Sequence, residues 1–191
     1  MRILAVNTMS RSIALAALAT GILLLVPLAA MQFTDEVVWT ALDFSVAGAL
    51  LFGAGLAFAL LTRTAGTFVY RAAAGIAVAA ALMLVWVNLA VGIIGSEDNP
   101  ANLMYAGVIA IEITGVLLAR LRPAGMSRAM FAAAIVQMAV AVIALAGGLG
   151  ATEPPGRLGI LVLNGFFVAL FAGSALLFRH AARSRGARKP A

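Results

Sequence analysis

The chain has 191 residues, of which 64% are hydrophobic and only 10% are charged, and its formal net charge is +6. An average soluble domain has about 25% charged residues, so this composition excludes a soluble globule and a disordered chain and leaves an integral membrane protein. The absence of cysteine excludes disulfides, thiolate metal sites and cysteine nucleophiles.

Six apolar stretches follow one another along the chain, and each can cross a hydrocarbon core of about 30 Å with about 20 residues. They predict an all-α integral membrane protein, a six-transmembrane-helix bundle in one membrane domain over residues 1–191. The predicted helices are residues 13–30, 44–61, 72–94, 101–121, 129–146 and 158–178. The first could instead be a cleaved signal peptide, but its apolar run exceeds the usual length of about 7–15 residues, which favours an uncleaved helix.

The residues that flank these stretches suggest where helices begin. Asp43 is predicted to cap the second helix and Ser127 the fifth, because short polar side chains accept hydrogen bonds from free amides of a first turn. Asn99 followed by Pro100 is typical of a cap and first-turn proline, here at the start of the fourth helix. Trp39, Tyr70 and Tyr105 fall near predicted interfaces, as members of an aromatic belt.

Small residues recur at four-residue spacing on three predicted helices, where they allow close approach of helix backbones in lipid. We expect them to pack within one bundle, with a dimer contact as the alternative reading. The three stripes are Gly53 with Ala57, Gly75 with Ala79, and Gly165 with Ala169 and Gly173.

The charged residues predict an orientation. In a six-helix topology, 12 of the 13 basic residues fall on one side, and only Arg157 falls on the other. Basic loops stay cytoplasmic, so both termini are expected inside a bacterial inner membrane, with residues 179–191 as a basic cytoplasmic tail. This rule accounts for the basic loops without invoking nucleic acid, so we expect no nucleic-acid partner. The acids expected on the outer side are Asp35, Glu36, Asp43, Glu97, Asp98 and Glu153.

Four polar side chains inside the predicted spans need an explanation: Glu112, Asn88, Gln137 and Asn164. Estimated depths place Glu112 and Gln137 near the middle and the two asparagines nearer the outer face, which predicts the pairs Glu112–Gln137 and Asn88–Asn164. An ionised carboxylate at the midplane costs several kcal/mol, and no basic residue lies at that depth. Glu112 is therefore either a proton- or cation-coupling group or a protonated packing residue. The three amides are expected to form hydrogen bonds between helices.

The outer acidic loops offer a second candidate site. Glu97, Asp98 and Asn99 place three oxygen-bearing side chains in a row, and Asp35 and Glu36 could join them to bind a cation. Their spacing matches no ligand motif, so a hydrated loop that fixes topology is the preferred interpretation. We expect no resident metal or other cofactor.

Several enzyme classes lack their residues. His180 is the one histidine and Lys189 the one lysine, and both lie in the C-terminal tail, which excludes bis-histidine haem ligation and a retinal Schiff base in the membrane. The chain has no GxSxG, Walker or HExxH motif. We therefore expect that the protein is not an enzyme.

The segment 86–105 reads WVNLAVGIIGSEDNPANLMY, with further distinctive residues at 51–56, LFGAGL, and 70–72, YRA. In these segments the chain resembles an uncharacterised family of small bacterial multi-pass inner-membrane proteins. The resemblance implies a six-helix membrane protein and brings no known activity, catalytic residue or ligand.

Three functions are compatible with this pattern. The preferred expectation is an accessory or structural component, embedded in the lipid bilayer as a homo-oligomer or as part of a larger membrane complex. The first alternative is an oligomeric proton- or cation-coupled transporter of a small solute, with Glu112 as its coupling group. The second alternative is a bundle that binds a lipid or a cofactor.

Overall fold

The computed structural model describes residues 2–63 and 65–186, and all of its helices and turns agree with an all-α protein. Six helices are long and apolar enough to cross a membrane, so the chain is a multi-pass membrane protein, as predicted. The helices are α1 (Arg2–Phe33), α2 (Ala41–Thr62), α3 (Phe68–Ala90), α4 (Met104–Ala119), α5 (Pro123–Ala146) and α6 (Gly156–Gly186), with a 3₁₀ turn, η1 (Pro100–Leu103), before α4.

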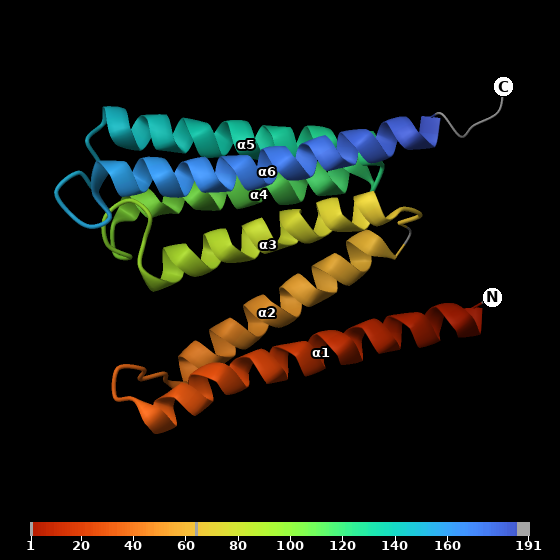
Figure 1. Ribbon diagram of the computed structural model, residues 1–191, viewed down its shortest axis with the longest axis horizontal. Coiled ribbons are helices and arrows are strands. Elements are labelled where there is room, and N and C mark those ends of the chain that lie inside the picture. Colours follow the sequence, from red (N-terminus) through yellow and green to blue (C-terminus); the bar gives the residue numbers. More distant parts are fainter. Residues whose placement is uncertain (1, 64, 187–191) are drawn as a thin grey trace. The chain divides into compact units, whose positions relative to one another are not determined.

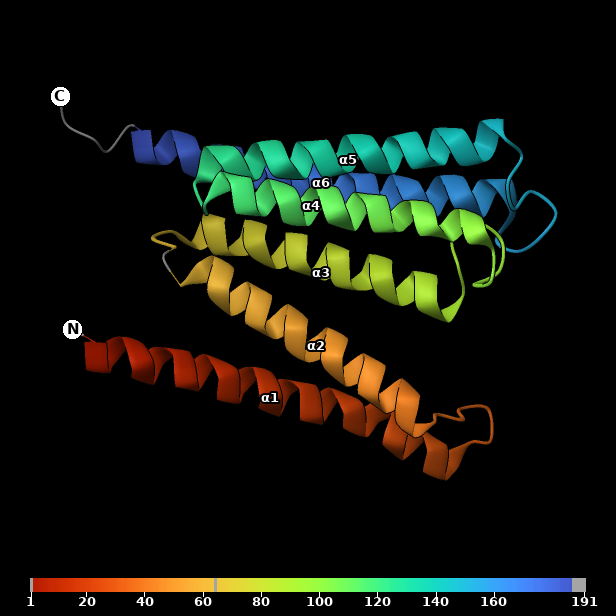
Figure 2. The same ribbon diagram turned by 180° about the vertical axis from the view of Figure 1, so that it is seen from behind.

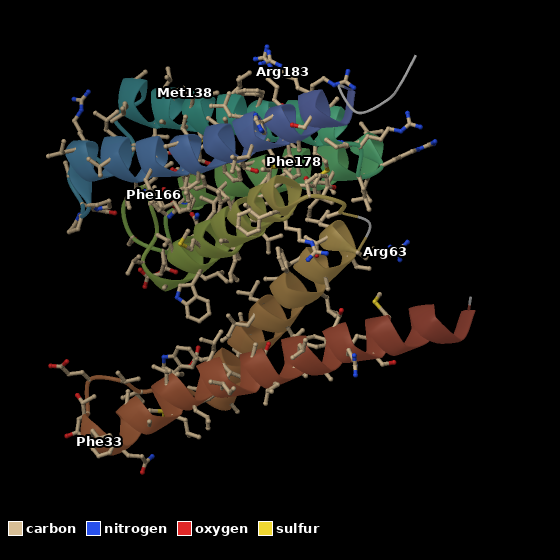
Figure 3. The ribbon with its side chains drawn as sticks, turned by 45° about the vertical axis from the view of Figure 1, so that its right-hand side comes forward. Phe33, Arg63, Met138, Phe166, Phe178 and Arg183 are labelled. Carbon is tan, nitrogen blue, oxygen red and sulfur yellow. The ribbon has the colours of Figure 1, made fainter. Side chains whose placement is uncertain are left out.

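The chain divides into two compact units, Met1–Arg63 and Thr64–Ala191, and the first is an antiparallel hairpin of α1 and α2. A Cβ atom on Gly55 would lie 2.9 Å from the Cβ atom of Ala16, so glycine permits the close crossing of the two helices. Phe33 and Arg63 lie at opposite ends of this hairpin (Figure 3). The prediction for its second helix needs one correction, because Thr40 is the N-cap and Asp43 is its capping-box partner.

The second unit consists of α3, α4, α5 and α6, which lie side by side and alternate in direction (Figures 1 and 2). The helix α5 packs against α4 and α6, and α6 also packs against α3. Along each helix of this unit, most buried residues recur three or four positions apart, which is the spacing that places them on one face against the neighbouring helices. On α6 they are Ile160, Asn164, Phe167, Phe171, Ser174, Ala175, Phe178 and Ala181.

One end of this unit is held by Tyr70, which is buried and packs edge-on against Phe178 with ring centroids 5.0 Å apart. The Tyr70 hydroxyl donates to the carbonyl oxygen of Leu121 at 3.1 Å, so α3 is tied to the turn between α4 and α5. Arg120 and Leu121 both have positive φ angles in that turn, 46° and 58°. Side chains rarely adopt this conformation, so the Tyr70 bond stabilises a turn that is otherwise unfavourable.

All six helices differ from their predicted ranges at one or both ends: α1 begins at Arg2 rather than at 13, and α3 is Phe68–Ala90 rather than 72–94. The helix α5 begins at Pro123 rather than at 129, because proline fits a first turn and the preceding Arg122 has the extended conformation of a cap. Ser127 is therefore inside α5, where its hydroxyl donates to the carbonyl oxygen of Ala175 on α6. The helix α6 continues through Gly186, so the described part of the basic tail is helical, and Arg188 and Lys189 lie outside the described residues.

The expected small-residue stripes are not where α4, α5 and α6 approach most closely. Gly165 and Ala169 are exposed on α6, and Cβ atoms on Gly165 and Gly173 would meet no heavy atom within 4 Å. The close approach is instead at Gly115 of α4, where a Cβ atom would lie 2.6 Å from the Cβ atom of Ala129 on α5. Sequence spacing finds small residues but does not say which helix face turns inward.

The charged residues of the four-helix unit separate between its two ends. We call one end the basic end; it carries Arg71, Arg120, Arg122, Arg128, Arg179 and Arg183, of which Arg183 is labelled in Figure 3. The opposite end, which we call the acidic end, carries Glu97, Asp98, Glu153 and the single basic residue Arg157. The alternating helix directions thus place the loop charges of this unit as the sequence predicted.

A substitution at Gly115 tests the close contact between α4 and α5. Gly115→Ala should lower the free energy of unfolding by about 1–3 kcal/mol, because the added methyl group overpacks against Ala129. Gly107→Ala on the same helix is the matched control, since its Cβ atom would meet nothing within 4 Å. Unfolding of both variants in mixed micelles should separate them, and equal stability would contradict the assigned contact.

Candidate functional site

A hydrogen-bonded polar cluster lies between α4, α5 and α6, with Asn164 at its centre. The Oδ1 atom of Asn164 accepts from Gln137 Nε2 at 2.9 Å and from the Tyr105 hydroxyl at 3.1 Å. Its Nδ2 atom donates to the backbone carbonyl of Ile160 one turn earlier, at 2.8 Å. Asn164, Gln137 and Tyr105 are all at most 2% exposed. One amide therefore links three helices inside the unit, and its hydrogen bonds are costly to lose because they join buried polar groups.

The sequence reasoning missed Tyr105 as a member of this cluster by assigning it to an interfacial belt. Tyr105 is 2% exposed and shares the buried face of α4 with Val108 and Glu112. The spacing of three and four residues that joins these positions was available in the sequence and could have indicated a common face. Its hydroxyl group then needs a partner inside the protein, and Asn164 supplies it.

Glu112 is the one acidic residue in the described interior of the four-helix unit, and its side chain is 6% exposed. Its Oε2 atom is buried and has no hydrogen-bond partner within the described part of the chain. Tyr105 on α4 and Asn164 on α6 are hydrogen-bonded, and the two helices run parallel. Glu112 lies seven residues after Tyr105, and Phe171 lies seven residues after Asn164, so Glu112 and Phe171 lie at the same level of the bundle. The carboxyl group therefore lies at an apolar level of the bundle.

The predicted pair Glu112–Gln137 is wrong. Gln137 donates to Asn164, and its Oε1 atom has no partner in the described residues. Gly115 lies against Ala129 on the antiparallel α5, so Ala132 is opposite Glu112 and Gln137 lies about 7.5 Å further along the axis. The depth estimate failed because α5 begins six residues earlier than expected, which shifts Gln137 from the middle of the helix toward the acidic end.

The predicted pair Asn88–Asn164 is also wrong. Asn88 Nδ2 donates to the carbonyl oxygen of Leu84 on its own helix at 2.8 Å, and Asn88 Oδ1 is buried without a partner in the described residues. The contact of the Ser174 hydroxyl with the carbonyl oxygen of Ala73 sets the register of α3 and α6. In this register Asn88 lies about one helical turn nearer the acidic end than Asn164.

The loop between α3 and η1 forms a cap over the acidic end, and Asn102 organises it. Asn102 Oδ1 accepts from the backbone amides of Ile93 at 3.1 Å and Ile94 at 2.9 Å. Asn102 Nδ2 donates to the carbonyl oxygen of Ser96 at 2.8 Å. Ile93 and Ile94 are both 0% exposed, so this one side chain holds two apolar residues against the bundle.

A second loop packs against this cap. The carboxylate of Glu153 accepts from the backbone amide of Ser96 at 3.3 Å. Gly95 and Gly150 have positive φ angles of 68° and 64°, and a Cβ atom on Gly150 would lie 2.5 Å from the Gly95 nitrogen. Glycine is required at both positions because the two loops approach through their backbones.

The acidic loop candidates do not assemble into a visible cation site. Glu97 and Asp98 are exposed, and Asn99 Oδ1 accepts from the Ala101 amide. Asn99 and Pro100 therefore form a cap and a first-turn proline, but of the 3₁₀ turn η1 rather than of α4, whose N-cap is Leu103. Asp35 and Glu36 belong to the other unit, Met1–Arg63. Among the residues that the structure describes, no group of three or more His, Asp or Glu side chains is placed to hold a metal ion.

The unpartnered groups in this interior are hydrogen-bond acceptors, and one of them can also bind a proton. Three buried oxygen atoms lack partners in the described residues, on Asn88, Glu112 and Gln137, and only the Glu112 carboxyl group can change its charge. A carboxylate here would be an uncompensated charge in an apolar region, whereas the neutral acid would not. The site can bind and release a proton.

The polar cluster predicts which of two substitutions destabilises the protein more. Asn164→Leu should destabilise the protein more than Gln137→Leu, by at least about 1 kcal/mol, because it leaves both the Tyr105 hydroxyl and Gln137 Nε2 without their acceptor. Gln137→Leu leaves the Tyr105–Asn164 bond in place. Reversible unfolding with an ionic detergent measures both variants, and an equal loss of stability would show that Asn164 is not the centre of the cluster.

Comparisons of the chain with protein families, with characterised proteins and with solved structures found no match. The resemblance carried by residues 86–105 therefore stays a prediction. The function has to be argued from the residues of the site itself, since membership of a fold class does not assign an activity.

Proposed function

We propose that this chain is a bacterial inner-membrane transporter in which proton or cation binding at Glu112 is coupled to movement of a small solute. The observation that supports this proposal is the Glu112 carboxyl group, which is 6% exposed and has a buried Oε2 atom without a partner in the described residues. Ionisable residues inside a membrane span are costly and commonly belong to ion pathways or proton relays.

The position of Glu112 suits a coupling role. A proton that binds there converts a buried charge into a neutral group, and this changes the energy of the site by several kcal/mol. Such a change is large enough to shift the balance between two packings of a helix bundle. The small size of the chain favours an oligomer as the transporting form.

The accessory or structural role expected from the sequence is the alternative function. It agrees with the exposed small residues Gly165 and Ala169 of α6, against which a helix of another membrane protein could pack. In this role Glu112 would be a neutral packing residue, and the protein would act by association rather than by transport. Neither role makes the chain an enzyme.

The proposal includes an orientation. The basic end would face the cytoplasm together with both termini, and the acidic end would face outward, because basic loops are retained on the cytoplasmic side. Helix α6 carries Arg179 and Arg183 as exposed residues at the basic end, where they could contact anionic lipid headgroups.

Single cysteines test this orientation, since the natural chain contains none. Asp98→Cys at the acidic end should react with a membrane-impermeant maleimide in intact cells. Arg183→Cys at the basic end should react only after the membrane is opened. Both native residues are exposed, so the two variants are matched. The opposite pattern would reverse the proposed orientation.

Glu112→Gln tests the coupling role, because it keeps the shape of the side chain and removes the group that binds a proton. In proteoliposomes that contain the full chain and are supplied with a mixture of small solutes, a potassium diffusion potential should drive proton uptake, and Glu112→Gln should reduce its rate by about tenfold or more. Glu97→Gln is the matched control, since this exposed acid lies outside the bundle and its replacement should leave the rate unchanged.

Two results would contradict the transport proposal. One is a wild-type flux no greater than that of empty liposomes, and the other is an equal flux in wild-type and Glu112→Gln proteoliposomes. Recovery of a stoichiometric partner from mild detergent, together with either result, would favour the accessory role.

A further inference from the structure

The unpartnered polar atoms of the four-helix unit are distributed unevenly along its length. Gln137 lies about 7.5 Å from the level of Glu112 toward the acidic end, and Asn88 lies about one turn beyond Asn164 in the same direction. With Tyr105, these residues form what we call the polar column: Asn88, Tyr105, Gln137 and Asn164. The column occupies the half of the unit between Glu112 and the acidic end.

The other half, between Glu112 and the basic end, is built differently. Its buried hydroxyl groups belong to Tyr70, Ser127 and Ser174, and each donates to a backbone carbonyl oxygen of a neighbouring segment. In the described part of the chain, this half has no buried side-chain oxygen or nitrogen without a partner. Large apolar side chains fill the space around these groups: Met126, Met130 and Phe178.

The charged groups on the neighbouring helices do not neutralise Glu112. The nearest in register are Arg128 on α5, Arg71 on α3 and Arg179 on α6, and all three are exposed toward the basic end. The nearest titratable group on α4 is Tyr105, two turns away within the polar column. Within the described residues, a carboxylate at Glu112 has no buried counter-ion, so a proton is the simplest species that neutralises it.

The number of ligands available favours a proton over a metal cation. Hard cations such as Mg²⁺ and Ca²⁺ need several oxygen ligands at about 2.0–2.6 Å. Glu112 is the one acidic residue in the described interior, and no group of three or more His, Asp or Glu side chains among the described residues is placed to hold a metal ion. A proton requires only one carboxylate oxygen.

We propose that, in this packing of the helices, protons reach Glu112 from the acidic end, along the polar column, and that the basic half of the unit is closed to them. Release toward the basic end would require the second packing that coupled transport involves. A hydronium ion at the acidic end gives up a proton: its O–H bond breaks and leaves water, and an O–H bond forms on a carboxylate oxygen of Glu112. The reverse step returns the proton to water and restores the carboxylate. This inference rests on the proposed function, because it assigns the direction from which its coupling proton enters.

The test measures protonation of Glu112 with dicyclohexylcarbodiimide, which reacts with neutral carboxylic acids in apolar surroundings. The full-length protein is prepared in right-side-out and in inverted membrane vesicles, whose orientation is read from the single-cysteine pair. Impermeant buffers set the pH on each side, and mass spectrometry quantifies the modified Glu112 peptide. Alkaline buffer at the acidic end should reduce labelling severalfold, whereas alkaline buffer at the basic end should leave it unchanged.

Two substitutions locate the route without requiring a new ligand. Gln137→Leu, within the polar column, should slow the loss of labelling severalfold after the pH at the acidic end is raised. Ser174→Ala, in the basic half, removes a satisfied hydroxyl and should leave that rate unchanged. Glu112→Gln abolishes the labelled peptide and identifies the signal.

Labelling that follows the pH at the basic end, or the pH of both ends equally, would overturn the inference, as would an unlabelled Glu112 at every pH. The labelling does not depend on solute movement, so it can fail or succeed separately from the proposed function. Labelling controlled from the acidic end without proton flux would support the entry route and contradict transport. Proton flux together with labelling controlled from the basic end would support transport and contradict the entry route.

Discussion

The interior of a bilayer offers no water, so each buried polar group of this protein has to find its partner within the chain. Helical backbones form their hydrogen bonds within each helix. Buried polar side chains then divide into those that have hydrogen-bond partners and those that do not. Asn164 is satisfied by Gln137, Tyr105 and Ile160 and so fixes the relation of three helices. Three side chains keep a buried oxygen without a partner in the described residues, on Asn88, Gln137 and Glu112, and of these only Glu112 can carry a charge.

The same requirement shapes the two ends of the four-helix unit. At the basic end, Tyr70 ties α3 to the turn after α4 and packs on Phe178, so the helices meet in a dry and satisfied contact. At the acidic end, the loop before α4 is folded by Asn102 and rests on Gly150 of the next loop. The buried side-chain hydroxyl groups of the basic half are all hydrogen-bonded, whereas the acidic half contains buried side-chain oxygen atoms without partners in the described residues.

The fold class could be predicted from the sequence because six apolar stretches and their intervening charges are local features. The partners inside the bundle could not, because they depend on helix register. An error of six residues at the start of α5 was enough to pair Gln137 with Glu112 instead of Asn164. The stripe of Gly165, Ala169 and Gly173 was misplaced for a related reason, since spacing alone does not reveal which face turns inward. Tyr105 was missed because an aromatic residue near a span end has two physical explanations.

The hydrogen bonds that Asn102 makes within the loop over the acidic end affect which residues of this protein can change in evolution. The shape of the loop over the acidic end depends on one amide side chain and two backbone glycines, whereas the helices beneath it are held by separate contacts. Glu97 and Asp98 lie on the exposed side of that loop and take no part in these hydrogen bonds. Their charges can change over evolutionary time while Ile93 and Ile94 stay in place, so the surface chemistry and the internal architecture are free to diverge independently.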